Sequence, residues 1–102
     1  MDDLIIGKFR QLLIGKKRHL VLTHHAEMRS SERKMENRLI QTDLHSGHII
    51  LIQELNSEIA SEQVFDVRLI GTDGQPMRYI LAINSLIRVI TLMKVSRMRP
   101  GD

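Results

Sequence analysis

The fold is decided by the stretch from Phe65 to Ile83, which reads FDVRLIGTDGQPMRYILAI. On both sides of its central Thr-Asp-Gly-Gln segment, apolar residues recur at every second position, as is typical of strands that bury one face. The buried set predicted from this alternation is Phe65, Val67 and Leu69 before the turn, and Tyr79, Leu81 and Ile83 after it. The stretch therefore predicts a β-hairpin with one face against a hydrophobic core.

The length of the turn sets the register of this hairpin. Residues that face each other across an antiparallel pair lie on the same face of the sheet. A two-residue loop would therefore set Leu69 against Arg78. A three-residue loop at 73–75 sets apolar residues against each other instead: Leu69 with Tyr79, Val67 with Leu81 and Phe65 with Ile83. We expect this second register, with Gly74 in the positive-φ region that such loops need. The other face would carry Asp66, Arg68 and Arg78 beside Ile70, Ile80 and Ala82.

Runs rich in Ile, Leu and Val flank the hairpin and predict the rest of the sheet. The expected strands are 48–55, 64–71, 77–84 and 87–96, with a polar loop at 56–63 and a short strand earlier, at 18–23. Consecutive strands usually pair as neighbours, so we expect an antiparallel meander.

The N-terminal half has mainly helical periodicity. A first helix is predicted within residues 1–15, with Asp2 or Asp3 as its cap and Gly15 as its stop. Two more helices are predicted at 24–33 and 37–46, the second ending at Gly47. Helices followed by strands indicate an α+β domain, in which N-terminal helices pack on a four- to five-stranded antiparallel sheet.

Length and composition fit a single domain spanning residues 1–102. With 42% apolar and 26% charged residues, the chain can bury one core but not two. The absence of cysteine excludes a disulfide framework and thiolate chemistry. The acidic start Met1-Asp2-Asp3 is unlike a secretory signal, and no apolar run is long enough to cross a bilayer. We expect a soluble, cytoplasmic protein with no membrane partner.

The charge of the chain weakly favours an anionic partner. The net charge is +3 and the pI is near 9.7, with basic clusters at 16–18 and at Lys94, Arg97 and Arg99. Such clusters are usually only a solvated face. One Tyr, two Phe and no Trp leave little surface on which unpaired bases could stack, so a stacking reader of single strands is disfavoured.

The segment from Thr23 to Arg33, THHAEMRSSER, carries most of the candidate chemistry. In a helix, His25, Arg29 and Arg33 lie on one side, because residues four apart are neighbours. Histidine changes charge near neutral pH, and arginine offers a fork of donors to phosphate oxygens. Ala26 and Met28 are the only apolar members, so burial does not explain this helix. The row indicates contact with a phosphodiester.

Structural roles explain the same residues equally well. The ring of His25 could bond a backbone carbonyl in the first turn, and Thr23 or His24 could be the helix cap. Arg29 and Arg33 could pair with Glu32, Glu36 or Asp43, tying the helix to the sheet. Both interpretations stay open on the sequence.

Metal and nucleotide chemistry are not indicated. The five histidines fall between positions 19 and 48, but no pair has the spacing of a zinc hydrolase. The chain has neither a glycine-rich phosphate loop nor a Ser-His-Asp order. We expect no metal and no cofactor.

Several weak elements in order resemble the family catalogued as domain of unknown function 4258. They are Thr23-His24-His25-Ala26, Arg29, Arg33, Met35, the Leu39/Leu44 helix, Gly47, Ile49-Ile50 and the late strand residues Arg88-Val89-Ile90-Thr91. The resemblance covers roughly 18–95 and leaves the first helix outside.

The resemblance implies the fold of the RelE-like toxins, within the compact endoribonucleases, for a core of residues 18–96. It implies RNA cleavage without a metal, by attack of the 2′-hydroxyl on the adjacent phosphate. On the matching positions, His25 would be the acid or base, and Arg29 and Arg33 would contact phosphate. Weaker additions from the late strands are Arg78, Thr91 and Lys94, as substrate-binding residues. The partners implied are RNA and a cognate antitoxin.

Two other functions remain open. The same basic surface could belong to a non-catalytic nucleic-acid- or protein-binding module. The first helix could instead mediate assembly of a structural or regulatory subunit. The sequence does not predict the oligomeric state.

Overall fold

The computed structural model describes residues 3–14, 20–32 and 36–95. Its helices are α1 (Asp3–Ile14), α2 (His24–Glu32) and α3 (Asn37–Ser46). Its strands are β1 (Leu20–Leu22), β2 (His48–Leu55), β3 (Gln63–Ile70), β4 (Pro76–Ile83) and β5 (Ile87–Lys94). The predicted helices and strands are thus confirmed, while Gly15, Arg33 and Met35 lie outside the described residues, as do the basic residues 16–18, 97 and 99.

The five strands form one mixed sheet in the order β1-β5-β4-β3-β2. The antiparallel meander predicted for β2 to β5 is confirmed. The prediction of a wholly antiparallel sheet is wrong at the other edge, because β1 runs parallel to β5. A hairpin would force an antiparallel pair, but helices and strands separate β1 from β5 along the chain, so either direction is possible.

The β3–β4 hairpin has the predicted faces but not the predicted register. The observed pairs are Leu69 with Met77, Val67 with Tyr79 and Phe65 with Leu81, two residues away from the prediction. The loop is 72–74 rather than 73–75, since the Gly71 N–H donates to the Gln75 carbonyl at 2.8 Å. Gly74 has the expected positive φ, 85°. A shift of two residues preserves side-chain parity, so the buried set is unchanged.

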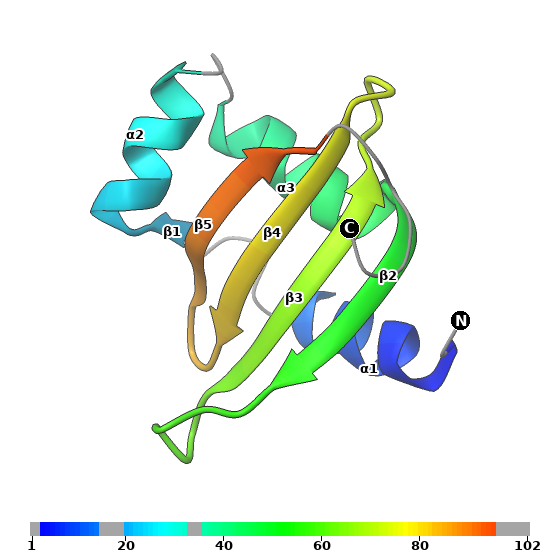
Figure 1. The fold of residues 1–102 in the computed structure, drawn as a ribbon. Helices are drawn as coiled ribbons and strands as arrows, with labels where there is room; N and C mark the ends of the chain where they lie inside the picture. The colour runs from blue at the N-terminus through cyan, green and yellow to red at the C-terminus, as the bar shows by residue number, and fades with distance from the viewer. Residues whose placement is uncertain (1–2, 15–19, 33–35, 96–102) are drawn as a thin grey trace.

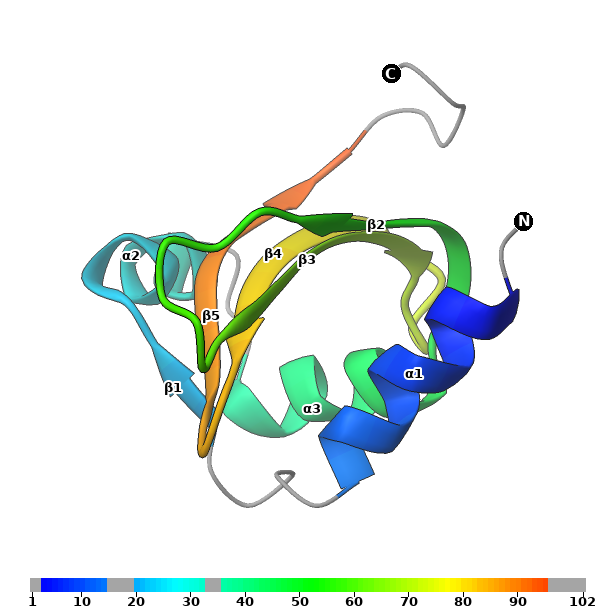
Figure 2. The same cartoon turned by 90° about the horizontal axis from the view of Figure 1, so that it is seen from below.

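The helices are placed in two different ways (Figures 1 and 2). Helices α1 and α3 cover one face of the sheet, as predicted. Helix α2 instead lies beside β5, at the sheet edge beyond the short β1. No helix of the described residues covers the opposite face, which we call the open face. By strand register, its polar side chains include His48, Gln53, Asp66, Arg68, Arg78, Arg88 and Thr91.

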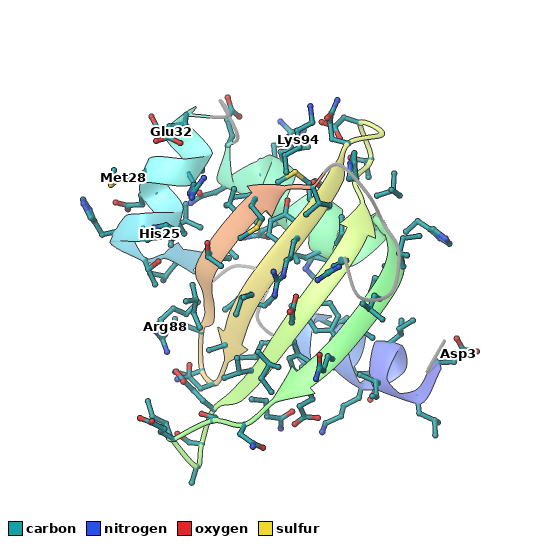
Figure 3. The ribbon with its side chains drawn as sticks, viewed as in Figure 1. Asp3, His25, Met28, Glu32, Arg88 and Lys94 are labelled. Atoms are coloured by element: carbon teal, nitrogen blue, oxygen red, sulfur yellow. The ribbon has the colours of Figure 1, made fainter. Side chains whose placement is uncertain are left out.

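Helix α2 and strand β5 run in the same direction (Figure 1). Figure 3 places His25 near the beginning of α2 and Glu32 at its end. It also shows Arg88 near the beginning of β5 and Lys94 at its end. His25 and Arg88 therefore lie toward one end of the β5 edge, and Glu32 and Lys94 lie toward the other.

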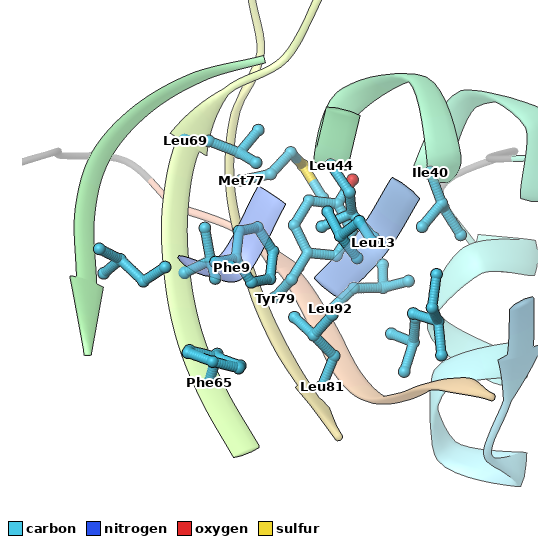
Figure 4. Close-up of a cluster of buried hydrophobic side chains, with 14 of the residues drawn as sticks. Phe9, Leu13, Ile40, Leu44, Phe65, Leu69, Met77, Tyr79, Leu81 and Leu92 are labelled. Atoms are coloured by element: carbon cyan, nitrogen blue, oxygen red, sulfur yellow. The ribbon is translucent and has the colours of Figure 1, made fainter. Parts of the chain in front are cut away.

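The core lies between the sheet and helices α1 and α3 (Figure 4). Phe9 of α1 meets Phe65 of β3 edge to face, with ring centroids 5.2 Å apart. Lys8 bonds Glu54 at 3.0 Å, and Arg10 donates to the Gly47 carbonyl. These contacts hold α1 against β2 and the end of α3. The fully buried side chains around the two rings include Leu13, Ile40, Leu44, Leu69, Tyr79, Leu81 and Leu92.

A buried carboxylate ties α3 to the β3–β4 turn. Asp43 is 1% exposed, and it accepts hydrogen bonds from the Thr72 N–H at 3.0 Å and the Tyr79 hydroxyl at 3.1 Å. Burial, and then the charge of Asp43, raise the pKa of Tyr79 well above its ordinary value. The Thr72 N–H is thereby taken out of the strand ladder. This contact accounts for the position of the turn.

Gly47 ends α3 as predicted, but for a different reason from the one expected. Its φ is −66°, so no left-handed conformation is involved. A Cβ at this position would lie 2.5 Å from the backbone carbonyl oxygen of Asp43. Glycine is needed here for space rather than for conformational freedom.

Candidate functional site

Thr23 positions the helix that carries the predicted site. Its Oγ1 accepts from the Ala26 N–H at 3.2 Å, which confirms it as the cap of α2. The same hydroxyl donates to the Ile90 carbonyl at 2.8 Å. Ile90 is the extra residue of a β-bulge in β5, where the register passes from Ile80–Thr91 to Leu81–Val89. One threonine thus starts α2 and anchors it beside Thr91.

Small residues let α2 approach β5 closely. Ala26 is fully buried and belongs to the hydrophobic core. Ser30, one turn later, is also buried, with its hydroxyl bonded to the Glu27 carbonyl at 3.0 Å. Because α2 has so little apolar surface of its own, the Thr23 bonds and these two residues account for its docking.

His25 and Arg29 remain available for a ligand. His25 is exposed and Arg29 is half-buried. Within residues 20–32 and 36–95, neither makes a side-chain hydrogen bond or an ion pair, including the predicted alternative pairs of Arg29 with Glu32, Glu36 or Asp43. Arg33 lies outside the described residues. The structural interpretation of the row is therefore not supported for its first two members.

Arg78 is on the open face but is already paired. Its Nε and Nη2 donate to the two oxygens of Asp66, at 3.0 and 2.6 Å. These hydrogen bonds raise the pKa of Arg78 above its ordinary value. A bidentate pair of this kind fixes the orientation of the guanidinium plane.

Arg68 lies directly opposite Arg78 on the neighbouring strand. Like charges in this arrangement repel each other. Asp66 is occupied by Arg78, and in the described part of the chain Arg68 has no ion pair. Its Nη1 is buried without a hydrogen-bond partner. This corner of the open face therefore has one positive charge more than its carboxylates can balance.

Thr91 adds a second polar atom with nothing to bond. Its side chain lies on the open face, opposite Ile80 and diagonal to Arg78. Its Oγ1 is also buried without a hydrogen-bond partner. Arg78 and Thr91, both predicted to bind substrate, thus lie close to each other on the open face. Arg68, opposite Arg78, lies in the same group.

Lys94 and Arg88 stand apart from this group. Lys94 is exposed at the end of β5 and pairs with Met77, so its side chain emerges on the helix-covered side. Arg88 is on the open face but bonds Glu62 at 2.9 Å, and Glu62 also accepts from Asn84. The structure therefore separates Lys94 from Arg78 and Thr91.

The sequence prediction missed Arg68. The parity of the hairpin already placed Asp66, Arg68 and Arg78 on one face. Counting charges on that face would have shown two arginines and one carboxylate. That imbalance is the signal that could have found it.

Neither a metal site nor a membrane span finds support in the described residues. No three His, Cys, Asp or Glu side chains there come close enough to hold a metal ion. Hollows of about 350 Å³ on α2 and 380 Å³ beside Leu12 are lined by none of the predicted site residues. No helix of the described segments is long and apolar enough to span a membrane.

Comparison of the chain with protein-family models, with curated proteins and with solved structures found no match. The resemblance noted in the sequence therefore remains a prediction. The geometry of α2 and the open face is what bears on function.

Proposed function

We propose that the protein binds the phosphodiester backbone of RNA at α2 and the adjacent open face, and cleaves it without a metal ion. The observation that carries the proposal is the unbalanced charge at Arg68 on β3, two strands in from the β5 edge. Beside that edge, His25 and Arg29 of α2 also have no carboxylate partner among the described residues. A phosphate supplies the missing negative charge and the missing acceptor for arginine donors.

Each residue has a role in this proposal. His25 takes the proton from the 2′-hydroxyl or returns one to the leaving 5′-oxygen. Arg29 and Arg33 contact the phosphate that is attacked, and Arg68, Arg78 and Thr91 bind a neighbouring stretch of backbone. Lys94, at the end of β5, would contact the RNA only where the RNA leaves the open face. The products would be a 2′,3′-cyclic phosphate and a 5′-hydroxyl.

The RelE-like fold is part of the same proposal. From Leu20 to Lys94 the chain has one strand, two helices and a four-stranded meander, and this order of elements supports the proposal, while the parallel β1–β5 pair departs from the antiparallel sheet that the resemblance implies. A toxin of this type would have a cognate antitoxin as its partner and would act in the cytoplasm. These points rest on the resemblance.

Cleavage is tested with a matched pair of histidine variants. His24 and His25 are adjacent and both exposed, but only His25 lies in line with Arg29. With EDTA present, we expect the wild type and His24→Ala to cleave single-stranded RNA and His25→Ala to lose at least about a hundredfold in rate. A substrate lacking the 2′-hydroxyl at the cut site should stay intact.

The cleavage proposal fails if purified wild-type protein leaves RNA intact and its expression slows neither growth nor translation. It also fails if His25→Ala cleaves as fast as His24→Ala.

One observation favours a second candidate, a nucleic-acid-binding module without catalysis. The carboxylates of the open face, Asp66 and Glu62, are both bound to arginines. The Tyr79 hydroxyl is buried against Asp43. His25 would then have to act without a second proton-transfer group from these residues. Salt-dependent RNA binding that His25→Ala leaves unchanged, with no cleavage by the wild type, would favour this function.

A further inference from the structure

A pocket of about 380 Å³ opens where β3 begins and β4 ends, beside the last turn of α1. This is the lower end of the sheet in Figure 1. The residues that line the pocket are Leu12, Ser61, Gln63, Ile83, Asn84 and Ser85. We call it the Gln63 pocket. None of these six side chains is charged, so the pocket suits an uncharged ligand rather than a phosphate.

Gln63 has a hydrogen-bonding group that the fold leaves unused. It pairs with Ile83 across β3 and β4, and it shares a side of β3 with the core residue Phe65. Its side chain is therefore on the helix-covered side of the sheet. Its Oε1 is buried without a hydrogen-bond partner, which costs stability. Because Gln63 lines the pocket, an N–H group of a bound ligand can supply the missing donor.

Asn84, the other amide of the pocket, is already used by the fold. Its Oδ1 accepts from the Leu86 N–H at 2.9 Å, and its Nδ2 donates to Glu62 at 3.3 Å. Glu62 also accepts from Arg88 at 2.9 Å, so its charge is balanced. Asn84 thus belongs to a fixed wall, and Gln63 is the amide that is free to bind a ligand.

On the basis of the proposed function, we infer that the Gln63 pocket binds one base of the RNA. Each base has an edge on which an N–H donor lies beside an acceptor, and a glutamine amide matches such an edge with two hydrogen bonds. The hydroxyls of Ser61 and Ser85, both exposed residues, can donate or accept at the rim. Leu12 and Ile83 supply apolar contact for the ring. None of the six lining residues is aromatic, so hydrogen bonds rather than aromatic stacking hold the base.

This base belongs to a nucleotide away from the cleaved bond. Gln63 precedes Arg68 by five residues of β3, which is about 17 Å along an extended strand. Its side chain is also on the other side of the sheet from Arg68. The RNA must therefore pass round the end of the sheet to reach the pocket. We expect the pocket to govern which sequences bind, and not the proton transfer at His25.

Binding of a base is tested with free nucleosides, by NMR of the side-chain amides in the full chain. Adenosine, cytidine and uridine are titrated separately, and ribose and inorganic phosphate serve as probes without a base. We expect a saturable shift of the Gln63 amide with at least one nucleoside in the millimolar range, and none with ribose or phosphate. No saturable shift with any nucleoside, or an equal shift with ribose, would overturn the inference.

The residues of the pocket are tested by three variants. Gln63→Leu keeps the size of the side chain but removes the amide, and we expect nucleoside binding at least about tenfold weaker. Its folding should be at least as stable, because an unpaired buried acceptor is removed. Ser61→Ala, at an exposed position, should weaken binding about threefold. Gln75→Leu, at an exposed glutamine of the β3–β4 turn, is the matched control and should bind as wild type does. Unchanged binding by both Gln63→Leu and Ser61→Ala would overturn the inference.

The salt dependence of RNA binding separates the pocket from the phosphate contacts. Gln63→Leu should lower the affinity for RNA without changing the salt slope, because it removes no phosphate contact. Arg68→Ala should reduce the slope. A failure of the proposed function would appear instead as RNA binding that Arg68→Ala leaves unchanged, while nucleosides still bind at Gln63.

Discussion

Asp43 of α3 lies against one side of the β3–β4 hairpin and Arg68 of β3 lies on the other, and these two charged side chains have opposite surroundings. Asp43 lies on the helix-covered side, where the Thr72 N–H, the Thr72 hydroxyl and the Tyr79 hydroxyl all donate to it. Arg68 lies on the open face, with a buried Nη1 that has no partner and an arginine opposite.

The difference distinguishes a charged side chain with a structural role, Asp43, from one whose charge can be balanced by a bound ligand, Arg68. A buried carboxylate with all its donors in place holds the fold together, and removing it leaves those donors unpaired. A guanidinium beside a like charge, with no carboxylate of its own, costs the fold stability and is compensated only by an external anion. Substitution of Asp43 should therefore lower the free energy of unfolding, whereas substitution of Arg68 should lower the affinity for RNA.

The largest effect on stability is expected for Asp43→Ala. It leaves the Tyr79 hydroxyl and the Thr72 N–H without an acceptor, and we expect the free energy of unfolding to fall by about 4 kcal/mol. Urea denaturation measures this change. The control is Glu58→Ala, an exposed loop carboxylate, which should stay within about 0.5 kcal/mol of wild type. Equal effects of the two variants would contradict the role given to Asp43.

The next effect is expected for Gly47→Ala. The added Cβ would lie 2.5 Å from the Asp43 carbonyl oxygen and 3.1 Å from that of Ile70, both backbone atoms. The end of α3 must shift, and we expect a loss of about 2 kcal/mol in the same denaturation assay. An unchanged unfolding midpoint would show that α3 and β3 are less closely packed than described.

Alkaline pH probes the same core through Tyr79, the one tyrosine of the sequence. Its raised pKa means that folded and unfolded chains are both neutral at this group below about pH 10. Above that pH the unfolded chain ionises first, so this contribution to stability is full below pH 10 and is then lost by up to about 1.4 kcal/mol per pH unit. Tyr79→Phe should remove this part of the pH dependence. Phenolate absorbance in the folded wild type at pH 11 would argue against it.

A smaller effect is expected for Arg78→Ala on the open face. It leaves Asp66 without its bidentate partner but also relieves the repulsion of Arg68, which can then approach the carboxylate. We expect a loss of about 1 kcal/mol in unfolding free energy. A loss as large as that of Asp43→Ala would mean that the open-face pair is a second structural centre.

Much of this fold could be predicted from local patterns. The alternation from Phe65 to Ile83 gave the correct buried face, and the stripe of Ile40 and Leu44 gave α3 with its observed bounds. The register could not be derived, because a slip of two residues preserves parity and the choice is made by the tertiary contact of Thr72 with Asp43. The direction of β1 depends likewise on a distant partner, β5.

The candidate site was predicted less completely. Thr23 could be recognised as a cap, but its second bond goes to a carbonyl at a bulge that no local pattern shows. Of the three late-strand residues named as substrate-binding, Arg78 and Thr91 lie diagonal to each other on the open face, whereas Lys94 emerges on the other side of β5. Whether Arg68 or Arg78 takes Asp66 depends on side-chain geometry, so the unpaired arginine became visible only in three dimensions.

The most direct test of the account compares RNA binding with stability in Arg68→Ala. Fluorescence anisotropy with a labelled single-stranded RNA is measured across a salt series, beside urea denaturation of the same protein. We predict affinity at least about tenfold lower, a salt slope smaller by about 0.7, and an unfolding free energy within about 0.5 kcal/mol of wild type or above it. Unchanged RNA binding, or a stability loss like that of Asp43→Ala, would contradict the claim that the open face holds a charge awaiting a phosphate.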